Sequence, residues 1–194
     1  MLKHLRPALA LTIVLMILTG VAYPGLVTAV GQLLFPRQAN GSLIESNGRV
    51  AGSALIAQSF TAPHYFHPRP SAAGAGYDAA ASGGTNKGPT DRKLADTLIT
   101  EAVAEARALD GVPIGSVPAD RATRSASGLD PHISPANAEQ QVVRVARARG
   151  VPPGRVRALV NRRIEERTLG IWGDRRVNVL LLNLDLDRAF GTVP

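Results

Sequence analysis

The strongest constraint on this chain is an uncharged segment that runs from residue 7 to residue 31. As a helix it would span about 37 Å at ~1.5 Å per residue, and the hydrocarbon core of a bilayer is only about 30 Å thick. Lys3 and Arg6 precede the segment, and Arg37 is the first charge after it. Basic flanks tend to stay in the cytoplasm. We therefore expect a cytoplasmic N-terminus at residues 1–7, a transmembrane helix at 8–31 and an exported domain at 32–194.

Two other interpretations of this segment stay open. A cleaved export signal has a shorter apolar run and a small-residue cleavage site, and residues 28–30 offer no convincing cleavage pattern. A buried core helix of this length normally has a polar face. Within the segment, Pro24 lacks a backbone donor and is expected to kink or end the helix. If the helix continues, Gly25 and Ala29 share one face, where small residues allow another transmembrane helix to approach closely.

Composition limits the chemistry of the exported part. The chain has no cysteine, so neither a disulfide nor a thiol reaction is available to it. Aromatic residues make up only 4% of the chain, so the core must consist mainly of aliphatic side chains. The formal net charge of +7 favours anionic partners. Because the arginines fall within expected helices with few aromatics between them, the pattern does not indicate a nucleic-acid-binding surface.

Turn and cap residues predict an α+β domain with a small β-sheet packed by about three helices. Asn47 and Gly48 favour a hairpin turn within residues 41–57, and a long irregular segment over residues 60–89 follows, tied down by its aromatic residues. The apolar run at residues 176–186 predicts a buried strand. The expected helices are 91–109 with Thr90 as N-cap, 135–149 with Ser134 as N-cap, and 152 or 153 to 167.

In the second of these helices the side-chain pattern predicts a buried and a solvated face. Val142, Val145 and Ala146 are expected to face inward. The basic residues expected to face water are Arg144, Arg147 and Arg149.

The glycine-rich segment at residues 82–90 precedes the first expected helix. Glycine amides and a helix N-terminus favour anions. However, a phosphate-binding loop needs Gly-Lys-Ser/Thr, whereas Lys87 here precedes Gly88, and Pro89 withholds an amide. We interpret the segment as a turn that leads into a capped helix, with a phosphate or nucleotide site and a partner contact as alternatives.

A second segment, residues 125–135, contains Ser127, Asp130 and His132. These are the residue types of a hydrolytic triad, and an exported serine hydrolase is our alternative function. A triad needs the three groups to converge in space, and the usual nucleophile elbow Gly-x-Ser-x-Gly is absent from the sequence. We favour a rigid turn in which Asp130 and Ser134 cap backbone amides.

A third segment, residues 64–72, carries His64 and His67. Together with His132 they could be imagined as zinc ligands, but a structural zinc site wants four regularly spaced ligands. We expect no metal. Instead, we expect the stiff segment around Arg69 to present its guanidinium to a carboxylate or a partner.

These segments and two others resemble, in order, the C subunit of the Kdp-type potassium-transporting ATPase, a bacterial inner-membrane complex. The resemblance covers nearly the whole chain, and only the looser Phe66-His67-Pro68 departs from the family pattern. The matching motifs are Arg69-Pro70-Ser71-Ala72, Tyr77-Asp78-Ala79, Ser82-Gly83-Gly84-Thr85-Asn86 with Gly88-Pro89-Thr90, Ser127-Gly128-Leu129-Asp130-Pro131-His132-Ile133-Ser134-Pro135-Ala136, and Arg176-Val177-Asn178-Val179-Leu180 with Leu182-Asn183-Leu184.

The resemblance implies a non-catalytic accessory subunit of a high-affinity ATP-driven potassium uptake complex. Its implied partners are a potassium-channel-like subunit, a P-type ATPase subunit and a small fourth subunit. The family is also described as a catalytic chaperone that raises the affinity of the ATPase subunit for ATP. Because an exported domain cannot touch cytoplasmic ATP, we expect no directly bound cofactor and an effect transmitted through the channel-like subunit. A cytoplasmic nucleotide-binding module is the competing interpretation.

The motifs also supply the candidate interface residues. They are Arg69, Pro70, Ser71, Tyr77, Ser82, Gly83, Gly84, Asn86, Gly88, Pro89, Ser127, Gly128, Asp130, Pro131, His132 and Ser134.

Overall fold

The computed structural model describes residues 2–46 and 48–193 of the chain. Contacts divide the chain into two compact units, Met1–Leu43 and Ile44–Pro194. Each unit is described by itself below.

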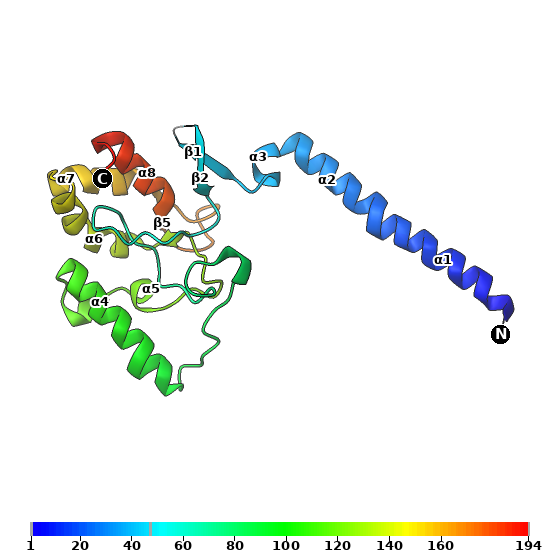
Figure 1. The fold of residues 1–194 in the computed structure, drawn as a ribbon, viewed down its shortest axis with the longest axis horizontal. Helices are drawn as coiled ribbons and strands as arrows, with labels where there is room; N and C mark the ends of the chain where they lie inside the picture. Colours follow the sequence, from blue (N-terminus) through cyan, green and yellow to red (C-terminus); the bar gives the residue numbers. More distant parts are fainter. Residues whose placement is uncertain (1, 47, 194) are drawn as a thin grey trace. The chain divides into compact units, whose positions relative to one another are not determined.

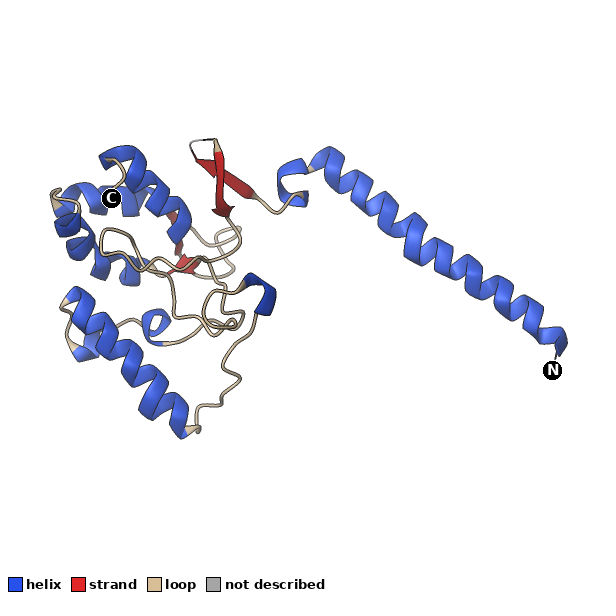
Figure 2. Cartoon of the chain, in the orientation of Figure 1, coloured by secondary structure: helices blue, strands red, loops and turns tan. Residues whose placement is uncertain are grey.

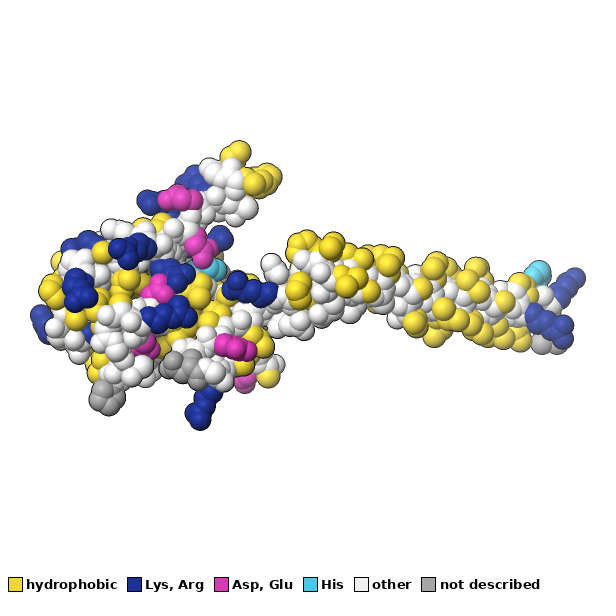
Figure 3. Space-filling model, turned by 90° about the horizontal axis from the view of Figure 1, so that it is seen from above, with side chains coloured by type: hydrophobic (Ala, Val, Ile, Leu, Met, Phe, Trp, Pro, Cys, Tyr) yellow, Lys and Arg dark blue, Asp and Glu magenta, His cyan; other side chains and the backbone are white. Residues whose placement is uncertain are grey.

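The first unit is dominated by a continuous helix over Leu5–Leu34, which contains an 18-residue stretch that has a mean hydropathy of 2.1 and is not buried. Figure 3 shows apolar side chains along its length and basic side chains at its N-terminal end. The prediction of a helix long and apolar enough to span a membrane is thus confirmed. The short elements beside it are a 3₁₀ turn at Leu2–His4 and α3 at Pro36–Ala39.

The helix does not end at Pro24, contrary to one of our two expectations for that residue. It consists of α1 (Leu5–Ile17), a π-helical turn η2 (Leu18–Ala22) and α2 (Tyr23–Leu34). The Tyr23 N–H donates to the Leu18 carbonyl, five residues back. Proline has no backbone N–H, so the helix loses one hydrogen bond at Pro24. A wider turn of this kind is one way in which a membrane helix compensates for that loss. Gly25 and Ala29 therefore share one face of α2.

The second unit has a three-stranded antiparallel sheet in the order β3-β5-β4, formed by His132–Ile133, Arg176–Asn178 and Ile164–Glu165. A separate two-stranded sheet pairs β1 (Leu43–Ser46) with β2 (Arg49–Ser53). This is the predicted hairpin, although β2 ends at Ser53 rather than at residue 57. The predicted turn residue Asn47 lies outside the described residues.

Helices α6 (Pro135–Ala148), α7 (Pro153–Arg162) and α8 (Val179–Phe190) lie close together, as Figures 1 and 2 show. Their buried side chains contribute to a mainly aliphatic core. Phe66, from the long irregular segment, is fully buried in this core, which explains how that segment is held. The structure confirms the α+β fold. The helical elements are η3 (Ala79–Ala81), η4 (Leu94–Ile99), α4 (Thr100–Asp110), η5 (Ile114–Ser116), α5 (Ala119–Ala122), α6 (Pro135–Ala148), α7 (Pro153–Arg162) and α8 (Val179–Phe190).

The predicted strand at residues 176–186 is wrong beyond Asn178, because α8 begins at Val179. The side chain of Asn178 accepts a hydrogen bond from the Leu181 N–H and so caps the helix. Leu182 and Leu186 are fully buried and lie four residues apart, as on one helix face. The apolar run thus has helical rather than strand spacing.

Two other predicted boundaries also differ. Helix α7 ends at Arg162 instead of residue 167, because Ile164 pairs with Val177 in the sheet. The predicted N-cap Thr90 is replaced by Asp91, whose carboxylate accepts a hydrogen bond from the Leu94 N–H at 3.2 Å.

Candidate functional site

The motif segments 69–84 and 126–134 are far apart in sequence but meet in the second unit. Asp130 accepts hydrogen bonds from Arg69 Nη1 at 3.1 Å and from the His132 N–H at 3.0 Å. Burial raises the pKa of the Asp130 carboxyl, but the hydrogen bonds from His132 and Arg69 outweigh burial and hold this pKa below its usual range. The expectation that Arg69 meets a carboxylate is therefore confirmed.

Ser71 and Tyr77 fix the bend that follows Arg69. The Ser71 hydroxyl donates to the Gly128 carbonyl at 2.7 Å and accepts from the Tyr77 N–H at 2.8 Å. The Tyr77 hydroxyl donates to the Arg69 carbonyl at 2.8 Å. Burial, followed by the charge of Glu105, raises the pKa of Tyr77 to about 12, so this hydroxyl stays a donor at neutral pH. The bend is thus held by its own polar groups.

Two glycines allow the segments to approach closely. A Cβ on Gly128, which has a φ of +69°, would lie 2.6 Å from the Ala73 nitrogen. A Cβ on Gly84 would lie 2.7 Å from the Ala126 carbonyl oxygen. The Gly83 N–H and the Ser82 hydroxyl both donate to the Ser127 carbonyl, at 2.9 and 3.0 Å. Because the chain itself uses these groups, they do not form a phosphate cradle.

The remaining candidates fall into three groups. Pro131 is buried, and its carbonyl accepts from the Val179 N–H at 2.9 Å, which ties the motif to α8. Ser134 caps α6 as predicted, and its hydroxyl also donates to Asp120 at 2.9 Å. The exposed residues beyond this cluster are Asn86, Gly88 and Pro89.

The triad residues do not form a triad in the described residues. His132 Nδ1 lies 3.6 Å from Asp130 Oδ1, but no hydrogen bond joins Ser127 to His132, and the Ser127 hydroxyl accepts instead from the Leu129 N–H at 3.1 Å. Among the same residues, no group of three His, Asp or Glu side chains could hold a metal ion. The geometry is that of a satisfied turn.

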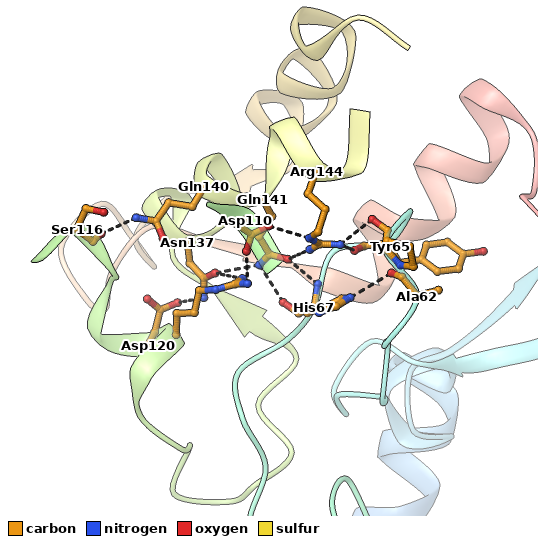
Figure 4. A network of polar contacts seen from close by, with 12 residues as sticks. Ala62, Tyr65, His67, Asp110, Ser116, Asp120, Asn137, Gln140, Gln141 and Arg144 are labelled. Carbon is orange, nitrogen blue, oxygen red and sulfur yellow. Dashed lines mark hydrogen bonds and ion pairs between the residues drawn. The ribbon is translucent and has the colours of Figure 1, made fainter. Parts of the chain in front are cut away.

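A second, buried polar network was missed by the sequence analysis and is drawn in Figure 4. The fully buried Asp110 carboxylate pairs with Arg121 and with Arg144, whose Nε lies 2.7 Å away. Arg144 also donates to the Pro63 and Tyr65 carbonyls at 2.7 and 2.9 Å, which fastens the irregular segment to α6. The prediction that Arg144 faces water is therefore wrong.

Gln141 extends this network to His67. Its side-chain oxygen accepts from the His67 N–H at 2.8 Å, and its amide donates to the His67 carbonyl at 3.1 Å. Burial and then the charge of Arg144 lower the pKa of His67 to about 4, so its imidazole is neutral at pH 7. A polar line beside the apolar stripe, formed by Asn137, Gln141 and Arg144 at helical spacing, was the available signal in the sequence.

Arg149 is also not solvated, contrary to the prediction. Its side chain is fully buried, donates to the His64 carbonyl at 2.7 Å and pairs with Asp187 at 2.8 Å. Its guanidinium lies 5.0 Å from the centre of the Tyr65 ring. Only Arg147 of the three is exposed as expected.

A cavity of about 370 Å³ lies between the irregular segment and α4. The motif residues Pro70, Ser71 and Tyr77 contribute to its wall, together with Glu105 and Arg121.

Known proteins match this chain over almost its whole length. The family model for the c chain of the K⁺-transporting ATPase matches residues 5–188. The potassium-transporting ATPase KdpC subunit of Gemmatimonas aurantiaca is 59% identical over 195 residues, covering 100% of this chain and 97% of that protein. The KdpC subunit of Myxococcus xanthus is 56% identical and covers 96% of this chain and 89% of its own length. The KdpC subunit of Mycobacterium bovis is 51% identical and covers 97% of this chain and 100% of its own length. The chain therefore belongs to the KdpC family, the c chains of K⁺-transporting ATPases.

Proposed function

We propose that this chain is the accessory, non-catalytic subunit of an ATP-driven potassium uptake complex in a bacterial inner membrane. The helix Leu5–Leu34, uncharged beyond Arg6 and without burial in its apolar stretch, carries the proposal because it needs a lipid or protein environment that the chain does not provide. Lys3 and Arg6 support a cytoplasmic N-terminus and a second unit outside the cytoplasm. The names of the relatives support the potassium-transporting complex.

The subunit assembles and stabilises the complex through two contacts. Its anchor packs through Gly25 and Ala29 against a transmembrane helix of the channel-like subunit, because small residues permit close approach. Its exported domain docks on the outer surface of the same subunit, and the P-type ATPase and small fourth subunits complete the assembly. The anchor raises the effective concentration of the domain beside its partner, so a small contact area suffices.

The proposed effect on ATP affinity is indirect. The domain binds no nucleotide itself in this scheme, because it lies on the opposite side of the membrane from ATP. Any change in the ATP affinity of the ATPase subunit is then a coupling free energy carried by the channel-like subunit. The Gly83 N–H already donates to the Ser127 carbonyl, so it is not available to a nucleotide phosphate, which supports this indirect effect.

Reporter fusions test the orientation. We expect alkaline phosphatase fused after Pro194 to be active and a reporter that works only in the cytoplasm to be inactive there. The reverse pattern would exclude the exported location and favour direct nucleotide binding.

A second experiment tests the two contacts. Removal of residues 1–30, with a cleavable export signal supplied, should leave potassium uptake at low potassium unsupported. Replacing both Gly25 and Ala29 with Leu should reduce recovery of the complex in mild detergent, whereas the same change at Val27 and Val30, which are already large, should not. Full uptake with the exported domain alone would show that the anchor does not pack specifically.

A further inference from the structure

The most exposed apolar side chains of the second unit lie together in one loop. Leu169, Ile171 and Trp172 are 79%, 74% and 65% exposed. Single exposed apolar residues are ordinary, but a contiguous group usually marks an interaction site. Within the described part of this unit, no other large apolar residues so close in sequence are exposed to this degree. We call residues 166–175 the Trp172 loop.

The Trp172 loop is held in a fixed shape by its backbone. Thr168 and Trp172 exchange two backbone hydrogen bonds, at 2.8 and 3.0 Å, and the Gly170 N–H donates to the Arg167 carbonyl at 2.9 Å. Leu169 has a φ of +54°, a left-handed conformation that is strained for a residue with a branched side chain. Local strain of this kind persists where the surrounding structure imposes it and is frequent at binding sites.

Charged pairs surround the apolar tip. Arg167 pairs with Asp174 at 3.4 Å and Arg175 pairs with Glu166 at 3.0 Å. Next to them, Arg176 pairs with Glu165 at 3.0 Å. An apolar centre containing Trp inside a polar, Arg-containing rim has the composition of a protein–protein contact.

We infer that the Trp172 loop is the docking tip of the exported domain, and that its partner is an apolar depression with a polar rim on the exported surface of the channel-like subunit. This inference rests on the proposed function and names the surface that performs it. A lipid surface is less suited, because it imposes no shape that would favour a strained Leu169. The rim carries as many carboxylates as arginines, so it has no net positive charge to attract anionic headgroups.

The first test is recovery of the complex in mild detergent through a tag on the channel-like subunit. We expect Trp172→Ser and Ile171→Ser in the full-length chain each to weaken association by about thirtyfold or more, as for a central Trp contact. The matched controls are Ile114→Ser and Leu55→Ser, whose side chains are 64% and 61% exposed elsewhere in the unit. The controls should be recovered normally.

Unfolding of each variant in urea shows whether the loop changes act through folding. Because these side chains are exposed, their unfolding midpoints should equal that of the unsubstituted chain. Reduced recovery accompanied by a lowered midpoint, or undiminished recovery, would overturn the inference.

The second test places a photoreactive phenylalanine analogue at position 172 of the full-length chain in native membranes. A covalent adduct with the channel-like subunit is the expected result. Adducts only with lipid or with a second copy of this chain, or no adduct, would overturn the inference. If the unsubstituted chain itself fails to co-purify with the channel-like subunit, the proposed function fails instead.

Discussion

Substitution of Asp110 by Asn tests whether the buried network of Figure 4 stabilises the second unit. The Asp110 side chain is fully buried, and its two oxygens accept from Arg121 and Arg144, whose side chains are each 7% exposed. Asn keeps the size of the side chain but removes its charge and turns an amide N–H₂ toward guanidinium donors. Two buried cations would then lack their shared counter-ion.

The expected loss of unfolding free energy is about 3–5 kcal/mol, the range for removing one partner from a buried ion pair. The stability of a domain is only about 5–15 kcal/mol, so the substitution removes roughly a fifth or more of it. For a domain of this size the melting temperature should fall by roughly 10 °C. Arg144 also fastens the irregular segment to α6, so that segment should loosen first.

Urea unfolding of the full-length chain in detergent, followed by circular dichroism, gives the measurement. Asp174→Asn is the matched control, because Asp174 is 93% exposed and its pair with Arg167 is open to water. The control should leave the midpoint unchanged. A loss of less than about 1 kcal/mol in Asp110→Asn would refute the argument that this network stabilises the domain.

Three further predictions concern the motif cluster and its surroundings. Gly128→Ala should lower the unfolding free energy by about 1–3 kcal/mol, because its Cβ would meet the Ala73 nitrogen, whereas Gly83→Ala should have little effect, since nothing lies within 4 Å of its Cβ. His132→Ala should leave ATP hydrolysis by the intact purified complex largely unchanged, and abolished turnover with normal assembly would contradict the structural role. The folded-state pKa of His67 is about 4 and the unfolded value is about 6.5, so the unfolded chain binds more protons between these values. The contribution of His67 to the unfolding free energy should therefore be fully present above pH ~6.5 and be lost, by up to about 3 kcal/mol, as the pH falls toward 4. Urea titrations at several pH values measure this decline, and His67→Gln should show a flatter profile.

Much of the helical framework was predictable because its signals are local. Ser134 before a proline predicts the start of α6, and the left-handed Gly111, with a φ of +68°, ends α4. The run at residues 176–186 misled the prediction because a short apolar stretch fits a buried strand and a buried helix equally well. The capping side chain of Asn178 decides between them, and its role depends on the position of a single residue.

The candidate site was predictable only in part, because its interactions join residues far apart in sequence. Local capping by Asp130 and Ser134 follows from residue type and spacing. The pairing of Arg144 with Asp110 does not, because it depends on how α4 packs beside α6. An arginine on an amphipathic helix is usually solvated, so only the neighbouring Asn137 and Gln141 hint that this face is covered.

The π-helical turn at Leu18–Ala22 changes the directions in which the anchor presents its side chains. A single π turn adds about one residue to the helix and so rotates everything beyond it by roughly 100° relative to an uninterrupted α-helix. A stripe of side chains along α1 therefore does not continue onto α2. A straight neighbouring helix that follows one face of α1 would meet a different face beyond Ala22. The N-terminal and C-terminal halves of this helix thus present differently directed faces, and the face that carries Gly25 and Ala29 belongs to the second half alone.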